Sequence, residues 1–156
     1  MNDIVKEPNE ILHQKSEIVK LPLSKEDKQL LDEMYTYLKV NSDIAVGISA
    51  VQVGVLKRMC AIKTIIGGNV YNYKLVNPKI VRHSAKKYYL EEGCLSVDEE
   101  HHELVGRYDE IMVMAYDAIQ NKNITIHTSG WLSRVLQHEI DHMDGILYTD
   151  RIEKEC

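Results

Sequence analysis

Two histidines four residues apart are the strongest chemical signal in the sequence. They stand in His138-Glu139-Ile140-Asp141-His142, within a run whose apolar residues recur at helical spacing. Residues four apart on an α-helix project from the same face, so both imidazoles can bind one metal ion. Glu139 is offset from His138 by about 100° around the helix axis. Its carboxylate can therefore act as a general base on a metal-bound water without being a ligand.

Two histidines leave a catalytic site one protein ligand short, because such sites usually combine three protein ligands with a water molecule. Cys94 is the attractive candidate, since a thiolate binds zinc or ferrous iron strongly. Gly93, just before it, lets the backbone approach closely. The competing interpretation is that Cys94 is a small buried apolar residue, which is the common role of a free cysteine. We assign that role to Cys60, which lies in an apolar run.

Two other ligand sets fit the sequence poorly. A third histidine after Gly145 would fall at position 148, which is tyrosine. A carboxylate on a following helix would have to come from Glu153 or Glu155, in the short stretch after Met143. Such a ligand would need an awkward reversal of the chain.

A third segment, residues 45–54, contains two glycines and a single amide side chain, Gln52, in an apolar run. Taken alone, it has two interpretations. One is a buried strand in which the backbone satisfies Gln52. The other is that the Gln52 amide donates a hydrogen bond to an oxyanion.

Two helices and several strands are expected to position these segments. Ser24 begins a capping-box sequence, and helical spacing then predicts a helix to about Val40. Ser129 can cap a final helix to about Met143, which Gly145 can end because it tolerates positive φ. Strands are predicted at residues 58–66, 70–76, 79–82, 88–91, 111–118 and 124–127. The pattern indicates an α+β fold: an N-terminal helix, and mostly antiparallel sheets packed around a C-terminal metal-binding HExxH helix.

Composition narrows the class of protein. A chain of 156 residues has the size of one domain, which we expect to cover residues 1–156. The net charge of −5 argues against nonspecific nucleic-acid or anionic-membrane binding. No run approaches the roughly 18 apolar residues of a membrane span, and the start lacks a signal peptide, so a cytoplasmic protein is expected. The odd cysteine count, three, argues against a disulfide framework, and Cys156 is expected to be an exposed terminal thiol.

Three motifs in this order resemble those of the peptide deformylase family. Residues 45–54 resemble the family's Gly-x-Gly-Leu-Ala-Ala-x-Gln-x-Gly. Residues 92–96 read Glu-Gly-Cys-Leu-Ser, and residues 137–142 match Gln-His-Glu-x-Asp-His. The likeness extends to Arg107, Asp144-Gly145 and Asp150-Arg151, and we expect Arg107 to form a structural ion pair.

The resemblance implies a function and a set of site residues. Cys94, His138 and His142 would bind a divalent metal, Fe(II) first, with Zn(II) or Ni(II) as alternatives. Glu139 would be the general base, and the Gln52 amide and the Leu95 backbone N–H would hold the oxyanion. The residues implied in substrate binding are Val46, Gly47, Gly93, Trp131, Arg134 and Val135. The substrate would be an N-formylmethionyl nascent peptide, which would release formate. The ribosome would be a transient partner. No basic C-terminal helix of the kind that some members use there follows Arg151, so docking by that route is unsupported.

Four residues depart from the family pattern: Ala45 for glycine, Ser49 for alanine, and Val51 and Asp98 where proline is common. A Cβ at residue 45 matters only if φ is positive there, and a buried Ser49 hydroxyl needs a partner. Three other functions stay open. They are hydrolysis of another small amide, peptide binding without turnover, and proteolysis by a small metalloprotease.

Overall fold

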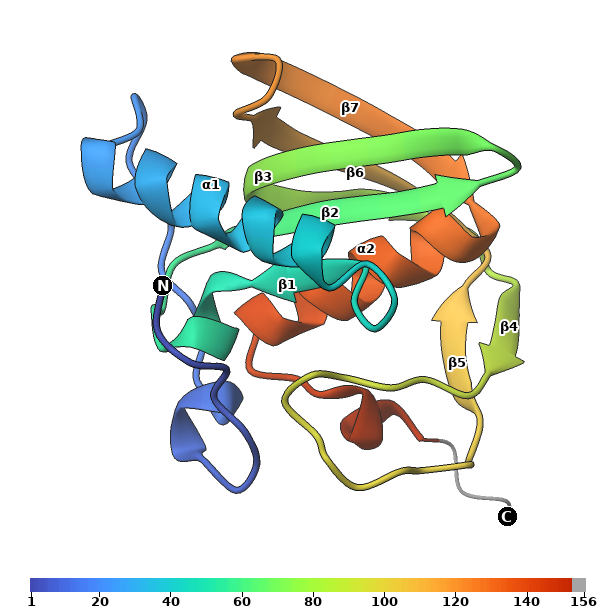
Figure 1. Ribbon diagram of the computed structural model, residues 1–156. Coiled ribbons are helices and arrows are strands. Elements are labelled where there is room, and N and C mark those ends of the chain that lie inside the picture. Colours follow the sequence, from blue (N-terminus) through green and yellow to red (C-terminus); the bar gives the residue numbers. More distant parts are fainter. Residues whose placement is uncertain (153–156) are drawn as a thin grey trace.

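The computed structural model describes residues 1–152 (Figure 1). Residues 153–156 lie outside the described residues, and with them Glu153, Glu155, Cys156 and the end of the expected domain. The described part contains two α-helices, α1 (Lys25–Val40) and α2 (Gly130–Met143). It also contains three 3₁₀ helices: η1 (Glu10–His13), η2 (Ala50–Val53) and η3 (Tyr148–Arg151). Neither α-helix is long and apolar enough to cross a membrane.

Antiparallel strands form two sheets, so the fold class is α+β. The larger sheet has the strand order β1-β2-β3-β6-β7, and the smaller pairs β4 with β5. The strands of the larger sheet are β1 (Gly47–Ser49), β2 (Met59–Ile66), β3 (Asn69–His83), β6 (Glu110–Asp117) and β7 (Lys122–Ser129). Those of the smaller are β4 (Lys87–Leu90) and β5 (Val105–Tyr108). Since β1 is at one end of the order, it is an edge strand among the described residues.

A helix packs on each face of the larger sheet: α2 lies against one face, and α1 lies against the other face at β1, β2 and β3 (Figure 1). Successive side chains of β2 alternate between two apolar clusters. Met59 and Ala61 pack with the buried face of α1, whereas Cys60 and Ile62 pack with α2. This alternation follows from the two-residue period of a strand. Ser49 in β1 points to the α2 side, where its hydroxyl contacts that helix. Cys60 is fully buried, as predicted.

Two strand predictions need correction. The runs predicted at residues 70–76 and 79–82 are one strand, β3, interrupted by a register shift between Val76 and Lys79. Asn77 has a φ of +52° there and Pro78 follows, so a β-bulge absorbs the proline, which cannot donate to the ladder. Strand β5 was not among the predicted strands, because a four-residue strand that contains Gly106 has little local signal.

The helix ends follow from specific residues. The Ser24 hydroxyl accepts a hydrogen bond from the Asp27 N–H at 3.1 Å, as a cap does. In a capping box the Asp27 carboxylate would accept a hydrogen bond from the Ser24 backbone N–H. Here that carboxylate binds Lys57 Nζ at 2.7 Å. Ser129 is the N-cap residue of α2, but its side chain makes no capping hydrogen bond. Gly145 has a φ of +73° just after α2, the left-handed conformation that its type permits.

Candidate active site

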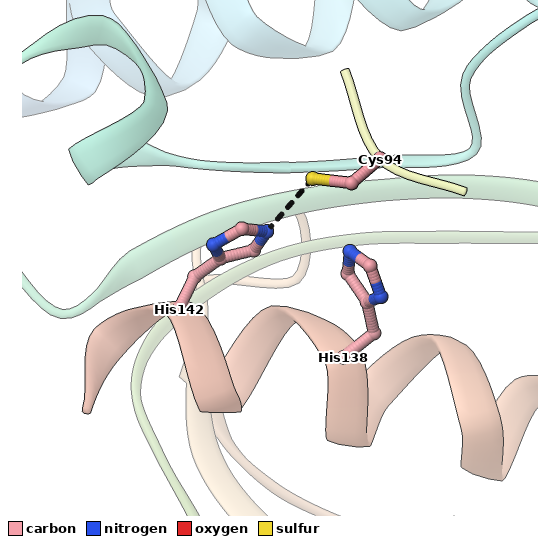
Figure 2. Close-up of side chains that lie close together, drawn as sticks. All are labelled: Cys94, His138 and His142. Carbon is pink, nitrogen blue, oxygen red and sulfur yellow. Dashed lines mark hydrogen bonds between the residues drawn. The ribbon is translucent and has the colours of Figure 1, made fainter. Parts of the chain in front are cut away.

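Three side chains with metal-binding atoms meet beside α2 (Figure 2). His138 and His142 project from the helix toward Cys94, which comes from the loop after β4. One donor atom from each residue lies within 4.8 Å of the others. Cys94 Sγ and His142 Nε2 are 3.4 Å apart. Residues far apart in the sequence are thus brought together in one group.

The donor set and its spacing fit a divalent metal ion. Typical bond lengths to a thiolate and an imidazole place two tetrahedral ligand atoms about 3.5 Å apart, close to the 3.4 Å between Cys94 and His142. Burial lowers the pKa of His142 well below its ordinary value, so this imidazole is neutral, the form that binds metal. Burial also lowers the pKa of His138, but contacts with Cys94 and Glu92 outweigh it and raise the pKa to about 10. Metal binding at His138 therefore has to displace a proton.

Glu92 orients His138, a role that the sequence analysis missed. Its Oε1 accepts a hydrogen bond from His138 Nδ1 at 3.0 Å, which leaves Nε2 free to bind a metal. Burial acts to raise the pKa of Glu92, but hydrogen bonds from Arg107 and His138 outweigh it and hold the pKa well below its usual range. The sequence signal that could have indicated this role is that Glu92 directly precedes Gly93-Cys94.

Two buried arginines hold Glu92 in place. Arg107 donates from Nε and Nη2 to both Glu92 oxygens at 2.9 Å, and from Nη1 to Asp141 at 2.6 Å. Arg107 thus forms the ion pair that was expected of it. Arg134 donates from Nη1 to Glu92 Oε2, and from Nη2 to the backbone carbonyl groups of Tyr88 and Val105. The Arg134 guanidinium is therefore held within the protein by Glu92 and by these carbonyl groups.

Glu139 lies beside the donor group and is 3% exposed. Its Oε1 is 4.0 Å from His138 Nε2. Burial raises the pKa of Glu139 to about 6, which suits a group that takes up and releases a proton near neutral pH. A Cβ built on Gly47 would lie 3.0 Å from two Glu139 side-chain carbons, so a larger residue there would push the carboxylate by a few tenths of an ångström.

Gln52 is almost fully buried, and its amide has a defined orientation. Its Oε1 accepts the Ser49 backbone N–H at 2.9 Å. Its Nε2 consequently faces the donor group, 3.6 Å from Cys94 Sγ and 3.1 Å from Ser96 Oγ. The backbone satisfies one end of the amide while the other end points at the site, so the two interpretations of Gln52 are compatible.

A cavity of about 430 Å³ opens beside the donor group. All the residues expected to contact a substrate line it, as do Gln52, Cys94, Leu95, His138 and Glu139. Trp131 is 44% exposed and is held by a hydrogen bond from its indole N–H to Thr64 at 3.1 Å. Gly93 lies here with nothing within 4 Å of its Cβ position, so crowding does not explain why it is glycine.

One wall of the cavity is the edge strand β1. The Lys63 N–H donates to the Val46 carbonyl at 2.9 Å, so Val46 directs its backbone groups to β2. Because these directions alternate in an antiparallel ladder, Gly47 presents its N–H and C=O to the open edge. A peptide can pair with a strand at such an edge.

The structure accommodates the departures from the family pattern. Among the described residues, the non-glycine residues with positive φ are Asn77 and Asn121, so Ala45 is unstrained. Val51 is fully buried in the core, and Asp98 pairs with Lys6 at 2.7 Å on the surface. The Ser49 hydroxyl finds its partners on Glu139.

Together, the α+β fold and the Cys/His/His group beside a buried carboxylate are those of a metal-dependent hydrolase. A family model described as polypeptide deformylase matches residues 1–156. The peptide deformylase of Oceanobacillus iheyensis is 41% identical over 168 positions, which cover 99% of this chain and 91% of that protein. The peptide deformylase of Shouchella clausii is 42% identical, over 98% of this chain and 90% of that protein.

Solved structures agree with these relatives. A crystal structure of peptide deformylase from Ehrlichia chaffeensis has a TM-score of 0.87 at 32% identity, over 99% of this chain and 89% of that one. The chain belongs to the polypeptide deformylase family. It is a hydrolase of protein biosynthesis that removes the N-formyl group from N-formylmethionyl peptides, and its family is metal-dependent.

Proposed function

We propose that Cys94, His138 and His142 bind one divalent metal ion at which N-formylmethionyl nascent peptides are deformylated. The observation that carries this proposal is the group formed by these three donors, two of which, Cys94 and His138, line one cavity with Glu139. Fe(II) is the proposed metal, as in most members of the family, and Zn(II) and Ni(II) are the alternatives that a thiolate and two imidazoles also suit. When bound, the metal supplies a Lewis acid that polarises the formyl group and activates water.

Three groups of this chain carry the chemistry in this proposal. Glu139 accepts a proton from the attacking water and delivers it to the amine nitrogen as the formyl C–N bond breaks. The Gln52 amide and the Leu95 backbone N–H donate to the formyl oxygen as it gains negative charge, each contributing about 3 kcal/mol to the barrier reduction. The products are formate and a free methionyl amino terminus.

The substrate peptide is proposed to lie along the edge of β1. Gly47 presents backbone groups for β-type pairing, with Val46 and Gly93 flanking the chain. Trp131 and Val135 line the pocket for the methionine side chain, together with the stem of Arg134. Since Glu92 holds the Arg134 guanidinium, we assign that residue to the wall of the pocket and not to a charge contact with substrate.

The setting of the reaction is proposed from its substrate. Nascent peptides emerge at the ribosome, so the protein is proposed to meet the ribosome transiently, in the cytoplasm. We assign this activity to a single deformylase domain over residues 1–156. The net charge of −5 gives no support to direct, sequence-specific nucleic-acid binding.

The test is formate release from formyl-Met-Ala-Ser by anaerobically purified protein loaded in turn with Fe(II), Ni(II) or Zn(II). We expect Glu139→Ala to keep its metal and lose turnover, and Cys94→Ser to lower the metal content. Near-full activity in Glu139→Ala would refute the base assignment, and unchanged metal content in Cys94→Ser would refute the ligand assignment. Acetyl-Met-Ala-Ser and casein as parallel substrates separate deformylation from hydrolysis of other amides and from proteolysis. Full metal occupancy without turnover of any substrate would indicate binding alone.

A further inference from the structure

Ser49 has no role in the reaction as proposed so far, although it is buried against the site. It lies in β1, is 1% exposed and stands where the family pattern has alanine. A buried hydroxyl in place of a methyl group is costly unless it is hydrogen-bonded. The partners that it has found are both on Glu139.

The Ser49 hydroxyl makes the two oxygens of the Glu139 carboxylate unequal. Ser49 Oγ is 3.1 Å from Glu139 Oε2 and within hydrogen-bond distance of it. Glu139 Oε1 is the oxygen that lies 4.0 Å from His138 Nε2, on the side of the metal-binding atoms. One oxygen is therefore anchored, and the other faces the place where the reaction occurs.

A carboxylate needs such an anchor to keep one orientation. The terminal torsion of a glutamate is broad, so without a partner the group rotates readily. A hydrogen bond to a charged acceptor is roughly twice as strong as one between neutral groups. Gly47, whose Cβ position lies beside Glu139, has no side chain that could hold the carboxylate by a hydrogen bond. Ser49 thus supplies a directional contact to the carboxylate.

We propose that Ser49 is a positioning residue for deformylation, and that its hydroxyl anchors Glu139 Oε2 so that Oε1 accepts the proton. This inference rests on the proposed role of Glu139 as the base. It assigns a catalytic consequence to a residue by which this chain departs from the family pattern.

A purely structural role for Ser49 is the alternative to exclude. Ser49 Oγ is also 2.9 Å from the main-chain oxygen of Glu139, and a hydrogen bond there would only hold α2 against β1. Ser49→Ala removes both contacts but keeps the backbone N–H that orients Gln52. Ser133→Ala is a matched control, because Ser133 is a fully buried serine whose hydroxyl also joins α2 to a backbone oxygen, that of Tyr108 at 2.9 Å.

The experiment measures kcat and KM for formyl-Met-Ala-Ser at full metal occupancy, with occupancy determined for each variant. For Ser49→Ala we expect kcat to fall about tenfold, because misplacing a reacting group by 1 Å costs about 100-fold and loss of one anchor moves it less. KM should change by less than about twofold, since the substrate contacts remain. Ser49→Thr, which restores a hydroxyl, should recover most of kcat. Ser133→Ala should keep kcat.

A second measurement keeps the test valid if threonine does not fit. Urea unfolding compares Ser49→Ala in the native background and in the Glu139→Ala background, where the main-chain oxygen remains and the carboxylate is gone. We expect a smaller loss of stability in the Glu139→Ala background. Equal losses in both would show that the bond to the main chain is the one that matters, and would overturn the inference.

Other outcomes also decide the question. An unchanged or increased kcat in Ser49→Ala, or a rise in KM at constant kcat, would overturn the positioning role. So would an equal fall of kcat in Ser133→Ala. If Glu139→Ala is inactive while Ser49→Ala is fully active, only this inference fails. If Glu139→Ala is active, the proposed base itself is wrong.

Discussion

Replacing Glu92 by glutamine should weaken both the fold and the metal site. The Glu92 side chain is 6% exposed, and the Arg134 side chain that it pairs with is 2% exposed. In Glu92→Gln the Arg134 charge stays buried without a carboxylate partner, whereas Arg107 keeps Asp141. Removing one member of a buried ion pair costs about 3–5 kcal/mol of stability. The glutamine oxygen can still accept a hydrogen bond from Arg134, so we expect the lower end of this range.

Glu91→Gln is the matched control, because it makes the same chemical change one residue away. The Glu91 side chain is 56% exposed and contacts His102 at 3.4 Å, so its loss should cost less than about 1 kcal/mol. In urea unfolding of chelator-treated protein, a loss of about 3 kcal/mol lowers the midpoint by about 1.5 M. Metal affinity should fall by about 10- to 100-fold in Glu92→Gln, because a neutral amide replaces the carboxylate that accepts the His138 hydrogen bond.

The pH dependence of stability gives an independent check on Glu92. Its pKa is lower in the fold than in the unfolded chain, where it is about 4.3. Its stabilisation is therefore fully present above about pH 5 and is lost progressively as the pH falls below that value toward the folded-state pKa. Glu92→Gln should lack this component, so its stability should fall less between pH 6 and 3. Equal midpoints for Glu92→Gln and Glu91→Gln, or an unchanged pH slope, would refute the reasoning.

Three glycines give further predictions. Gly47→Ala should reduce kcat by about 3- to 10-fold with unchanged metal content, because its Cβ would lie 3.0 Å from Glu139 and displace the carboxylate slightly. Normal formate release would contradict this. Gly145→Ala combines positive φ with a Cβ 2.6 Å from the His13 backbone, so urea unfolding should show a loss of about 3 kcal/mol. Gly54 also has positive φ, but no atom lies within 4 Å of its Cβ position, so Gly54→Ala should lose only the backbone cost of about 1 kcal/mol. Equal losses of stability in Gly145→Ala and Gly54→Ala would contradict the steric argument.

The pattern of the sequence was enough for the class of fold and for the type of chemistry. Helical spacing after Ser24 predicts α1, and the hairpins around residues 67–69 and 120–123 have the expected strands on both sides. The spacing of His138 and His142 by itself places both imidazoles on one helix face. These inferences succeed because they depend on residues within a few positions of one another, and local backbone geometry sets those relations.

Contacts between distant segments could not be read from the pattern. The pairing of Glu92 with Arg107 and Arg134, the contacts of Gln52 with Cys94 and Ser96, and the bond from Ser49 to Glu139 join residues 15 to 90 positions apart. The bulge that makes β3 one strand depends likewise on its partner β6. Each of these features is set by which segments pack together. Only tertiary structure specifies that packing, because a side chain's partners are determined by the burial of whole elements and not by its neighbours in the chain.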